Sequence, residues 1–416
     1  MQQKSYIDYH AHVWGTGYKV LHPRLDDARS VADVFDILRP SLLNHHGGFL
    51  TARGWDQNKW GQSHFPTRED LDALSTDIPI ALTRVDGHAM WCNSNALEVA
   101  GITRSTTIPP GGDILKTSSG EPTGILLDDA MGLVHRAMPP DDDSSITRTL
   151  RAGLDEFAKH HIGVHDMGIP AEWWEPYKKL YASDGDSLIN ADVFLDMSKQ
   201  TGRALFLQKL REERFDDSPH PKLRLVGIKL YLDGALGSRG AELFEDYSDD
   251  PGNRGLSLTS DEEALELMTL AAGAGLGIAI HAIGDKANAR ALDLFAKTPH
   301  PLHPIPNTLP RRIEHTQIVR EQDLPRFREL GVAAVIQPQF FASDRHWAIK
   351  RLGPERMKNA YRWKSLVDAG ATVLASSDSP VEEANANIGI ELLQTRDGVE
   401  DGEAVTREEA EKMYMS

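Results

Sequence analysis

Eight short apolar runs recur along this chain, and a segment with a helical pattern precedes each of the last seven. The runs lack strict alternation of polar and apolar residues, as expected of strands that are buried on both faces. Eight parallel strands that alternate with helices form a (β/α)8 barrel. The sequence therefore predicts an α/β fold of this TIM-barrel type, with strands near residues 6–13, 162–167, 190–195, 223–232, 277–281, 312–315, 332–336 and 371–376.

The chain is longer than such a barrel requires. It has 416 residues, whereas a barrel core typically takes ~250. The excess lies between the first strand and the second, from residue 12 to residue 162. We therefore expect a barrel made of residues 1–44 and 131–416, and an inserted subdomain, residues 45–130, that covers the barrel mouth. Within this insertion the pattern predicts a short helix from Trp91 to Ala100, which Gly101 ends.

The composition excludes several classes of protein. A formal charge of -17 argues against binding to nucleic acids or to anionic membranes. The single cysteine, Cys92, allows neither an internal disulfide nor a thiolate metal cluster. No apolar run could span a bilayer and no signal peptide is visible, so we expect a cytoplasmic protein that acts on a small molecule. The chain starts almost inside its first strand, so a lost leader and a truncated fragment both stay open. Whether the protein forms a homo-oligomer also stays open.

The first strand carries two histidines that point the same way. Residues two apart on a strand share a side, so His10 and His12 converge while Ala11 faces away. Two imidazoles on a rigid strand make half of a metal site. The alternative is a half-buried strand with two incidental histidines.

Other polar residues follow later strands. In a barrel of this type the chemistry lies at the carboxyl ends of the strands, where side chains from different strands converge. We therefore predict a metal centre, with zinc as the default ion for such nitrogen and oxygen ligands and with one or two ions. Its predicted ligands are His10, His12, Lys229, His281, His315 and Asp378.

Lys229 is unusual among these ligands because an ammonium repels a metal ion. It lies within an apolar strand, and burial lowers the pKa of a lysine towards the neutral, nucleophilic amine. One interpretation is a carbamylated lysine, in which the amine has taken up carbon dioxide and offers two anionic oxygens that bridge two metals. The alternative is a salt bridge to Asp233.

Seven further motifs accompany the predicted ligands. They are Arg84–His88, Asn93–Leu97, Gly120–Leu126, Gly227–Arg239, His281–Asp285, Ile313–His315 and Ser377–Val381. The predicted ligands resemble those of the amidohydrolase superfamily, and the seven motifs resemble amidohydrolase family 3, which includes the N-substituted formamide deformylases. The resemblance runs from about Asp8 to the last residue. It implies a barrel of the metal-dependent hydrolase type, and we expect the flanking β-sandwich of that family to be largely absent here.

The resemblance implies a metal-dependent hydrolase that cleaves a C–N bond in an amide, formamide or cyclic amide. Asp378 is the expected general base, which takes a proton from a metal-activated water and passes it to the leaving nitrogen. The alternative for Asp378 is an aspartate that only caps the following loop. The alternative functions are hydrolysis of esters or lactones at the same site, and a non-catalytic barrel scaffold.

Three further residues are candidate substrate contacts. His88 and Trp91 lie in the insertion, where they either contact substrate or pack the subdomain. Arg239 lies in a glycine-rich loop after the fourth strand, where it either binds a carboxylate or carbonyl of the substrate or pairs with Glu242.

Overall fold

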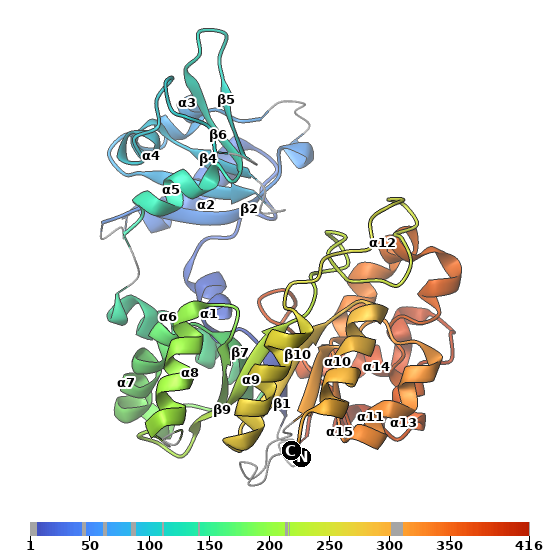
Figure 1. Ribbon diagram of the computed structural model, residues 1–416. Coiled ribbons are helices and arrows are strands. Elements are labelled where there is room, and N and C mark those ends of the chain that lie inside the picture. The colour runs from blue at the N-terminus through green and yellow to red at the C-terminus, as the bar shows by residue number, and fades with distance from the viewer. Residues whose placement is uncertain are drawn as a thin grey trace. The chain divides into compact units, whose positions relative to one another are not determined.

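The chain forms two compact units, one of residues 1–17 with 143–416 and one of residues 18–142 (Figure 1). The structure is a computed structural model, which describes residues 6–43, 47–60, 65–84, 89–109, 112–139, 142–212, 215, 217–300 and 311–415.

The larger unit contains the predicted (β/α)8 barrel, and it is nearly closed. Eight strands pair in parallel in the order β1-β7-β8-β9-β10-β11-β12-β13. Each lies where the apolar runs predicted a strand. Their bounds are Ile7–Ala11, Gly163–Ile169, Asn190–Asp196, Leu223–Tyr231, Gly277–Ala282, Arg311–His315, Ala333–Ile336 and Val373–Ala375.

Helices connect these strands as the pattern predicted, with one difference. The pattern predicted one helical segment before each of the last seven strands, but two helices, α12 from Pro338 and the separate α13, precede β13. Pro338 is at the first helical position, where its missing N–H costs nothing, and Gly353 with φ 75° breaks the run. The helices of this unit include α6 Asp143–Phe157, α7 Trp174–Asp184, α8 Gln200–Glu212, α9 Asp261–Gly273, α10 Asp285–Lys297, α11 Leu324–Leu330, α12 Pro338–Met357, α13 Trp363–Asp368, α14 Ala386–Thr395 and α15 Arg407–Lys412.

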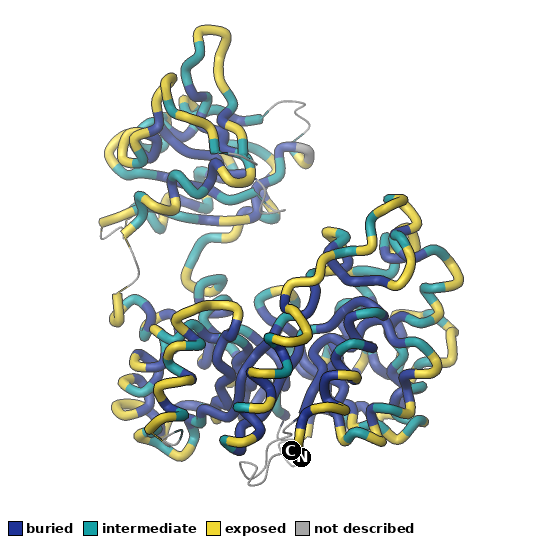
Figure 2. Tube along the Cα trace, viewed as in Figure 1, coloured by how far each residue is buried: buried dark blue, intermediate teal, exposed yellow. Residues whose placement is uncertain are grey.

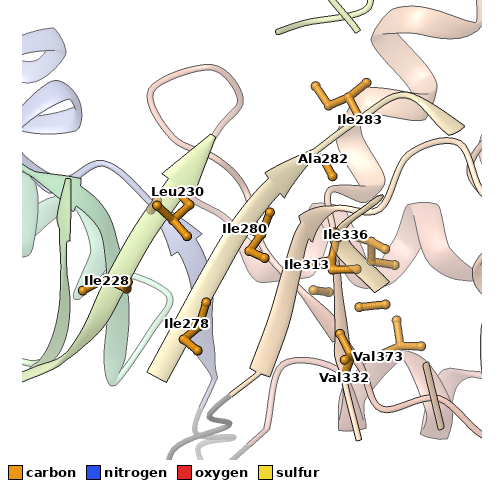
Figure 3. Close-up of a cluster of buried hydrophobic side chains, with 14 of the residues drawn as sticks. Ile228, Leu230, Ile278, Ile280, Ala282, Ile283, Ile313, Val332, Ile336 and Val373 are labelled. Atoms are coloured by element: carbon orange, nitrogen blue, oxygen red, sulfur yellow. The ribbon is translucent and has the colours of Figure 1, made fainter. Parts of the chain in front are cut away.

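The barrel strands turn one set of side chains outward to the helices and the other inward. Ile228 and Leu230 of β9 lie with Ile278 and Ile280 of β10 in the buried apolar cluster that Figure 3 shows. Lys229 occupies the alternate, inward position between Ile228 and Leu230. Burial is continuous along the strands, which are dark blue in Figure 2. This alternation is what directs the polar residues of the strands into the barrel.

The barrel closes where β1 meets β13. At the carboxyl end, Asp378 N donates to His10 O at 2.8 Å and His12 N donates to Ser379 O at 2.8 Å. At the amino end the last residues of the chain lie between the two strands. Ala375 N donates to Met413 O at 2.9 Å and Ile7 N to Tyr414 O at 2.7 Å.

The smaller unit has a five-stranded sheet in the order β2-β3-β4-β6-β5. This unit is longer than the expected insertion of residues 45–130, since it runs from residue 18 to residue 142. It includes α2, Val31–Leu43, which packs on β2. Its other main elements are β2 Leu50–Trp55, α3 Arg68–Asp72, β3 Ile80–Arg84, β4 Ala89–Cys92, α4 Ser94–Val99, β5 Gly112–Lys116, β6 Pro122–Asp128 and α5 Met131–Ala137.

The helix predicted from Trp91 to Ala100 was partly wrong. Trp91 belongs to strand β4, and α4 begins only at Ser94. Asn93 determines this start, because its side-chain oxygen accepts a hydrogen bond from Ala96 N at 2.9 Å and caps the helix.

The described part of the chain contains these two sheets. Across the same residues, none of the helices combines the length and the apolar character that a membrane crossing requires.

Tyr414 should stabilise the barrel closure. Its side chain is buried, lies against Gly389 of α14 and meets the ring of Tyr6 edge-on at 6.2 Å. We expect Tyr414→Ala to lower the free energy of unfolding by about 3–5 kcal/mol, as for other large buried aromatic residues. Urea denaturation measures this. Met415→Ala is the control, because that side chain is 44% exposed, and it should change stability by less than about 0.5 kcal/mol.

Candidate metal centre

The predicted ligands converge at the carboxyl end of the barrel. Ligand atoms of His10, His315 and Asp378 all lie within 4.8 Å of one another, and all three residues are buried. His12 joins them, with Nε2 3.1 Å from Asp378 Oδ1. His281 lies next to His315, and the centroids of the two rings are 4.4 Å apart. The structure thus brings four imidazoles and one carboxylate from the ends of four strands, β1, β10, β11 and β13, into one cluster.

The distances from Asp378 to His10 and His12 fit ligands that share one metal ion better than they fit hydrogen bonds. Asp378 Oδ1 is 3.3 Å from His10 Nε2 and 3.1 Å from His12 Nε2. Among the described residues this buried oxygen has no hydrogen-bond partner. Two ligands bound at about 2.0–2.1 Å in a tetrahedron lie roughly 3.3 Å apart. The separations are those that one ion between these three groups would require.

Glu314 fixes the orientation of His10. Its Oε2 lies 2.5 Å from His10 Nδ1, so the other ring nitrogen, Nε2, carries the free lone pair that faces Asp378. Arg312 holds the carboxylate in place from the same strand, with Nε 2.5 Å from Glu314 Oε1. Arg312 also donates to the carbonyl of Tyr9 and contacts His165 Nδ1 at 2.8 Å. A continuous buried network thus supports the first histidine.

His315 is oriented in the same manner by Gln337. His315 Nδ1 lies 2.9 Å from Gln337 Oε1, and Gln337 Nε2 donates to Ser376 Oγ at 2.9 Å. The other ring nitrogen of His315, Nε2, is therefore the one that can bind a metal ion. The backbone of His315 has φ 73°, an unusual value for a residue other than glycine. This turn at the strand end lets His315 face the site although its neighbour Glu314 also points inward.

Asp233 organises the loops around His281. It is completely enclosed and accepts hydrogen bonds from the backbone N–H groups of Glu242, Ile283 and Gly284. Its Oδ1 lies 3.5 Å from His281 Nε2. The alternative salt bridge between Lys229 and Asp233 is not formed among the described residues, because the loop backbone occupies this carboxylate.

The protonation states suit a cation. Burial lowers the pKa of His315 to about 3 and lowers the pKa of His281 well below its ordinary value. Both imidazoles are therefore neutral near pH 7 and can donate lone pairs. Burial works to raise the pKa of Asp378, but His10 and His12 outweigh it and hold that pKa well below its ordinary value. Asp378 is therefore an anion.

Lys229 lies beside this cluster on the inward face of β9. Its side chain is almost completely buried, and burial lowers its pKa to about 8. About a tenth of the amine is therefore neutral near pH 7, a much larger fraction than for an exposed lysine.

The donor set fits a divalent ion. Imidazoles and an ionised carboxylate are common zinc ligands, and Glu314 and Gln337 orient two of the imidazoles here. An unpaired buried carboxylate would cost several kcal/mol, which a bound cation would offset. The chemistry of these groups thus agrees with the predicted metal centre.

Of the three predicted substrate contacts, the structure describes Trp91 and Arg239. His88 lies outside the described residues. Trp91 is buried in the core of the smaller unit, packs against Trp55 and donates from Nε1 to Thr67 O at 2.7 Å. Arg239 forms a salt bridge to Asp249, with Nη2 3.0 Å from Oδ2, instead of the expected alternative partner Glu242. Their contacts with substrate stay predictions.

The supporting residues were missed in the sequence. Arg312 and Glu314 alternate on one buried strand, and charged residues in such positions need partners inside the barrel. That pattern could have indicated a buried ion pair. Gln337 and Asp233 gave no comparable signal, because their partners are distant in sequence.

Comparison with known proteins finds similarity to amidohydrolases. The model of the amidohydrolase family matches residues 6–415. YtcJ of Bacillus subtilis, described as an amidohydrolase, is 32% identical over 402 residues, which are 94% of this chain and 73% of YtcJ. The N-substituted formamide deformylase of Arthrobacter pascens is 28% identical over 366 residues, 84% of this chain and 65% of that enzyme.

A solved structure shows the same architecture. An uncharacterized metal-dependent hydrolase from Pyrococcus furiosus superposes with a TM-score of 0.80 at 28% identity, over 99% of this chain and 80% of that one.

Glu314→Gln should weaken metal binding. The amide removes the anion that orients His10, and loss of such a supporting partner typically costs 10–100-fold in metal affinity, so we expect about that loss. Competition with a chelating dye measures it. The matched control is Glu242→Gln, since Glu242 is also buried but pairs with Arg290 and Lys286. Equal affinity in wild type and Glu314→Gln would contradict the role given to Glu314.

Proposed function

The chain belongs to the amidohydrolase family, and from that premise we propose that it hydrolyses a C–N bond in an amide, formamide or cyclic amide with the help of one or two zinc ions. The observation that carries the proposal is the cluster of four imidazoles and Asp378 at the carboxyl end of the barrel. The similarity to the N-substituted formamide deformylase of Arthrobacter pascens supports the choice of a C–N bond.

The cation would be held by His10, His12, His281, His315 and Asp378. If a second cation binds, a carbamylated Lys229 would help to hold both. A bound divalent ion would polarise the substrate carbonyl and lower the pKa of a coordinated water towards ~7. The protein's own groups supply the proton transfers. Because an amide nitrogen leaves poorly as an anion, it needs a proton from a general acid.

Asp378 is the proposed general base and then general acid. Its carboxylate is ionised and buried in the cluster, so it can accept a proton there and return it to the nitrogen. The alternative role, capping the following loop, is less well supported, because Ser379 N donates to Ser377 Oγ at 3.0 Å. The hydrogen bond from Asp378 N to His10 O holds the residue at the correct strand end.

A substrate screen with the zinc-loaded protein tests the proposal. We expect turnover of chromogenic anilides such as 4-nitroformanilide and 4-nitroacetanilide. Turnover of 4-nitrophenyl acetate alone would favour the ester or lactone alternative. Metal binding without turnover of either class would favour the non-catalytic scaffold. That residues 45–130 cover the barrel mouth and select the substrate stays a prediction.

Asp378→Asn should remove the general base with little change in shape. General acid–base catalysis is typically worth about 10²–10⁴-fold, so kcat should fall by at least that order in steady-state assays. Asp344→Asn is a matched control, because Asp344 bonds to Tyr361 and Gln317 rather than to a predicted ligand. A variant Asp378→Asn that binds metal and keeps near-normal turnover would remove Asp378 from the mechanism.

Lys229 should react with carbon dioxide. The neutral amine attacks the carbon, a new N–C bond forms, and the released proton leaves an anionic carbamate. Protein kept in ¹³C-bicarbonate with zinc should show a carbamate resonance that Lys229→Ala lacks, and a short carboxylic acid should partly restore metal binding to that variant. Lys209→Ala is the control, since this second buried lysine is ion-paired with Asp217 at 2.8 Å. A signal that persists without Lys229 would contradict the assignment.

A further inference from the structure

Tyr231 stands beside two predicted ligands, and no step described so far uses it. It is the last residue of β9 and lies two positions after Lys229, so both side chains project inward. Lys229 Nζ lies 5.1 Å from the centroid of the Tyr231 ring. The parallel register pairs Tyr231 with His281 on β10, and the two rings are 5.7 Å apart. The phenol is therefore part of the wall of the cluster.

The hydroxyl of Tyr231 has no hydrogen bond within the described part of the chain, and its side chain is only partly buried. Other tyrosines of the barrel unit use theirs internally. Tyr181, Tyr247 and Tyr9 donate to the backbone oxygens of Ile189, Ala241 and Met415. A tyrosine hydroxyl without a hydrogen-bond partner inside the protein is available to a ligand.

Gly168 at the end of β7 makes room for this hydroxyl. Its φ is 74°, and a Cβ built there would lie 2.5 Å from Tyr231 Oη and 3.4 Å from Lys229 Cγ. In the sheet β8 separates β7 from β9, so the phenol reaches across the barrel interior towards the end of β7. Any residue with a side chain at position 168 would displace it. The backbone and the ring together fix the position of Oη.

The hydroxyl stays protonated at neutral pH. The ordinary pKa of a tyrosine side chain is about 10, so the phenol keeps its proton near pH 7. The group is therefore a hydrogen-bond donor throughout the pH range in which hydrolysis would occur. A donor of this kind stabilises negative charge without giving up its proton.

We propose that Tyr231 is a further catalytic residue, whose hydroxyl donates a hydrogen bond to the scissile carbonyl oxygen as that oxygen gains negative charge. No bond to the tyrosine forms or breaks, and the phenolic proton stays on Oη. The inference rests on the proposed hydrolysis of a carbonyl substrate, and it holds for an amide or an ester, because both pass through a tetrahedral oxyanion. The simpler alternative is that the ring only packs on Lys229.

Tyr231→Phe separates these roles, because it keeps the ring and removes the hydroxyl. With 4-nitroformanilide we expect kcat to fall about 10²–10³-fold, the typical loss of one oxyanion donor. The KM, the zinc content and the thermal midpoint should stay near those of wild type. Tyr247→Phe is the matched control, since the hydroxyl of Tyr247 donates to Ala241 O and not towards the site, and its kcat should not change.

Binding of phenyl methylphosphonate provides a readout that needs no turnover. This tetrahedral anion resembles the charged intermediate, so calorimetry with zinc-loaded protein should show weaker binding to Tyr231→Phe than to wild type, by a factor similar to the loss of kcat. A role in packing alone would leave this affinity unchanged.

Gly168→Ala tests the geometry through a double-mutant cycle. Alone it should displace Oη and lower kcat about as much as Tyr231→Phe. In the Tyr231→Phe background the added methyl group meets no oxygen, so the double variant should be little worse than Tyr231→Phe. Additive losses would overturn the assignment of Gly168 as the residue that positions the hydroxyl.

The possible failures are distinguishable. Wild-type turnover with unchanged kcat and phosphonate affinity in Tyr231→Phe overturns the role of Tyr231 and leaves the proposed function intact. A wild type that turns over neither anilides nor 4-nitrophenyl acetate overturns the proposed function. The role of Tyr231 is then tested by phosphonate binding alone. Equal affinity of wild type and Tyr231→Phe for the phosphonate, or no binding to either protein, overturns that role as well.

Discussion

The buried carboxylate of Glu314 is the constraint on which the rest of the site depends. It joins β11 to β1 through His10, and its partner Arg312 reaches the carbonyl of Tyr9 and the ring of His165 on β7. Three strands that are far apart in the sequence are therefore tied inside the barrel. Removal of one member would leave an uncompensated buried charge at a cost of about 3–5 kcal/mol. The orientation of the first histidine is thus coupled to the stability of the barrel, and the ligand cannot reorient alone.

Two predicted ligands, His315 and Asp378, adopt left-handed backbone conformations at strand ends. His315 has φ 73° and Asp378 has φ 55°, and such conformations cost about 1–3 kcal/mol each unless the surroundings determine them. Gln337 holds the ring of His315, and His10 O holds the backbone of Asp378. Asp8 adds to the second support, because it accepts a hydrogen bond from Ser377 Oγ at 2.6 Å. The local strain thus positions side chains that a regular strand would turn away from the site.

The sequence predicted the barrel well because its strands are continuous apolar runs, and it predicted the candidate ligands because barrel topology brings strand ends together. It did not predict the supporting network. Glu314 and His10 are 304 positions apart, and only the closed barrel makes them neighbours. It also misplaced the helix at Trp91, since the cap at Asn93 decides where that helix starts. Tyr231 was visible within a motif, but its free hydroxyl depends on the backbone of Gly168, which no pattern in β9 shows.

The charge of the Lys229 side chain and the number of cations that the site can bind depend on each other. Glu314 and Asp378 favour the ammonium form, while burial opposes it. A second divalent ion beside Nζ would place like charges together where water screens them weakly. Uptake of carbon dioxide reverses the sign of the side chain, but a carbamate without a second cation would add an uncompensated anion next to two buried carboxylates. We therefore expect either one ion with a free amine or two ions with a carbamate. The mixed states are disfavoured, so metal binding and carbamylation should rise and fall together.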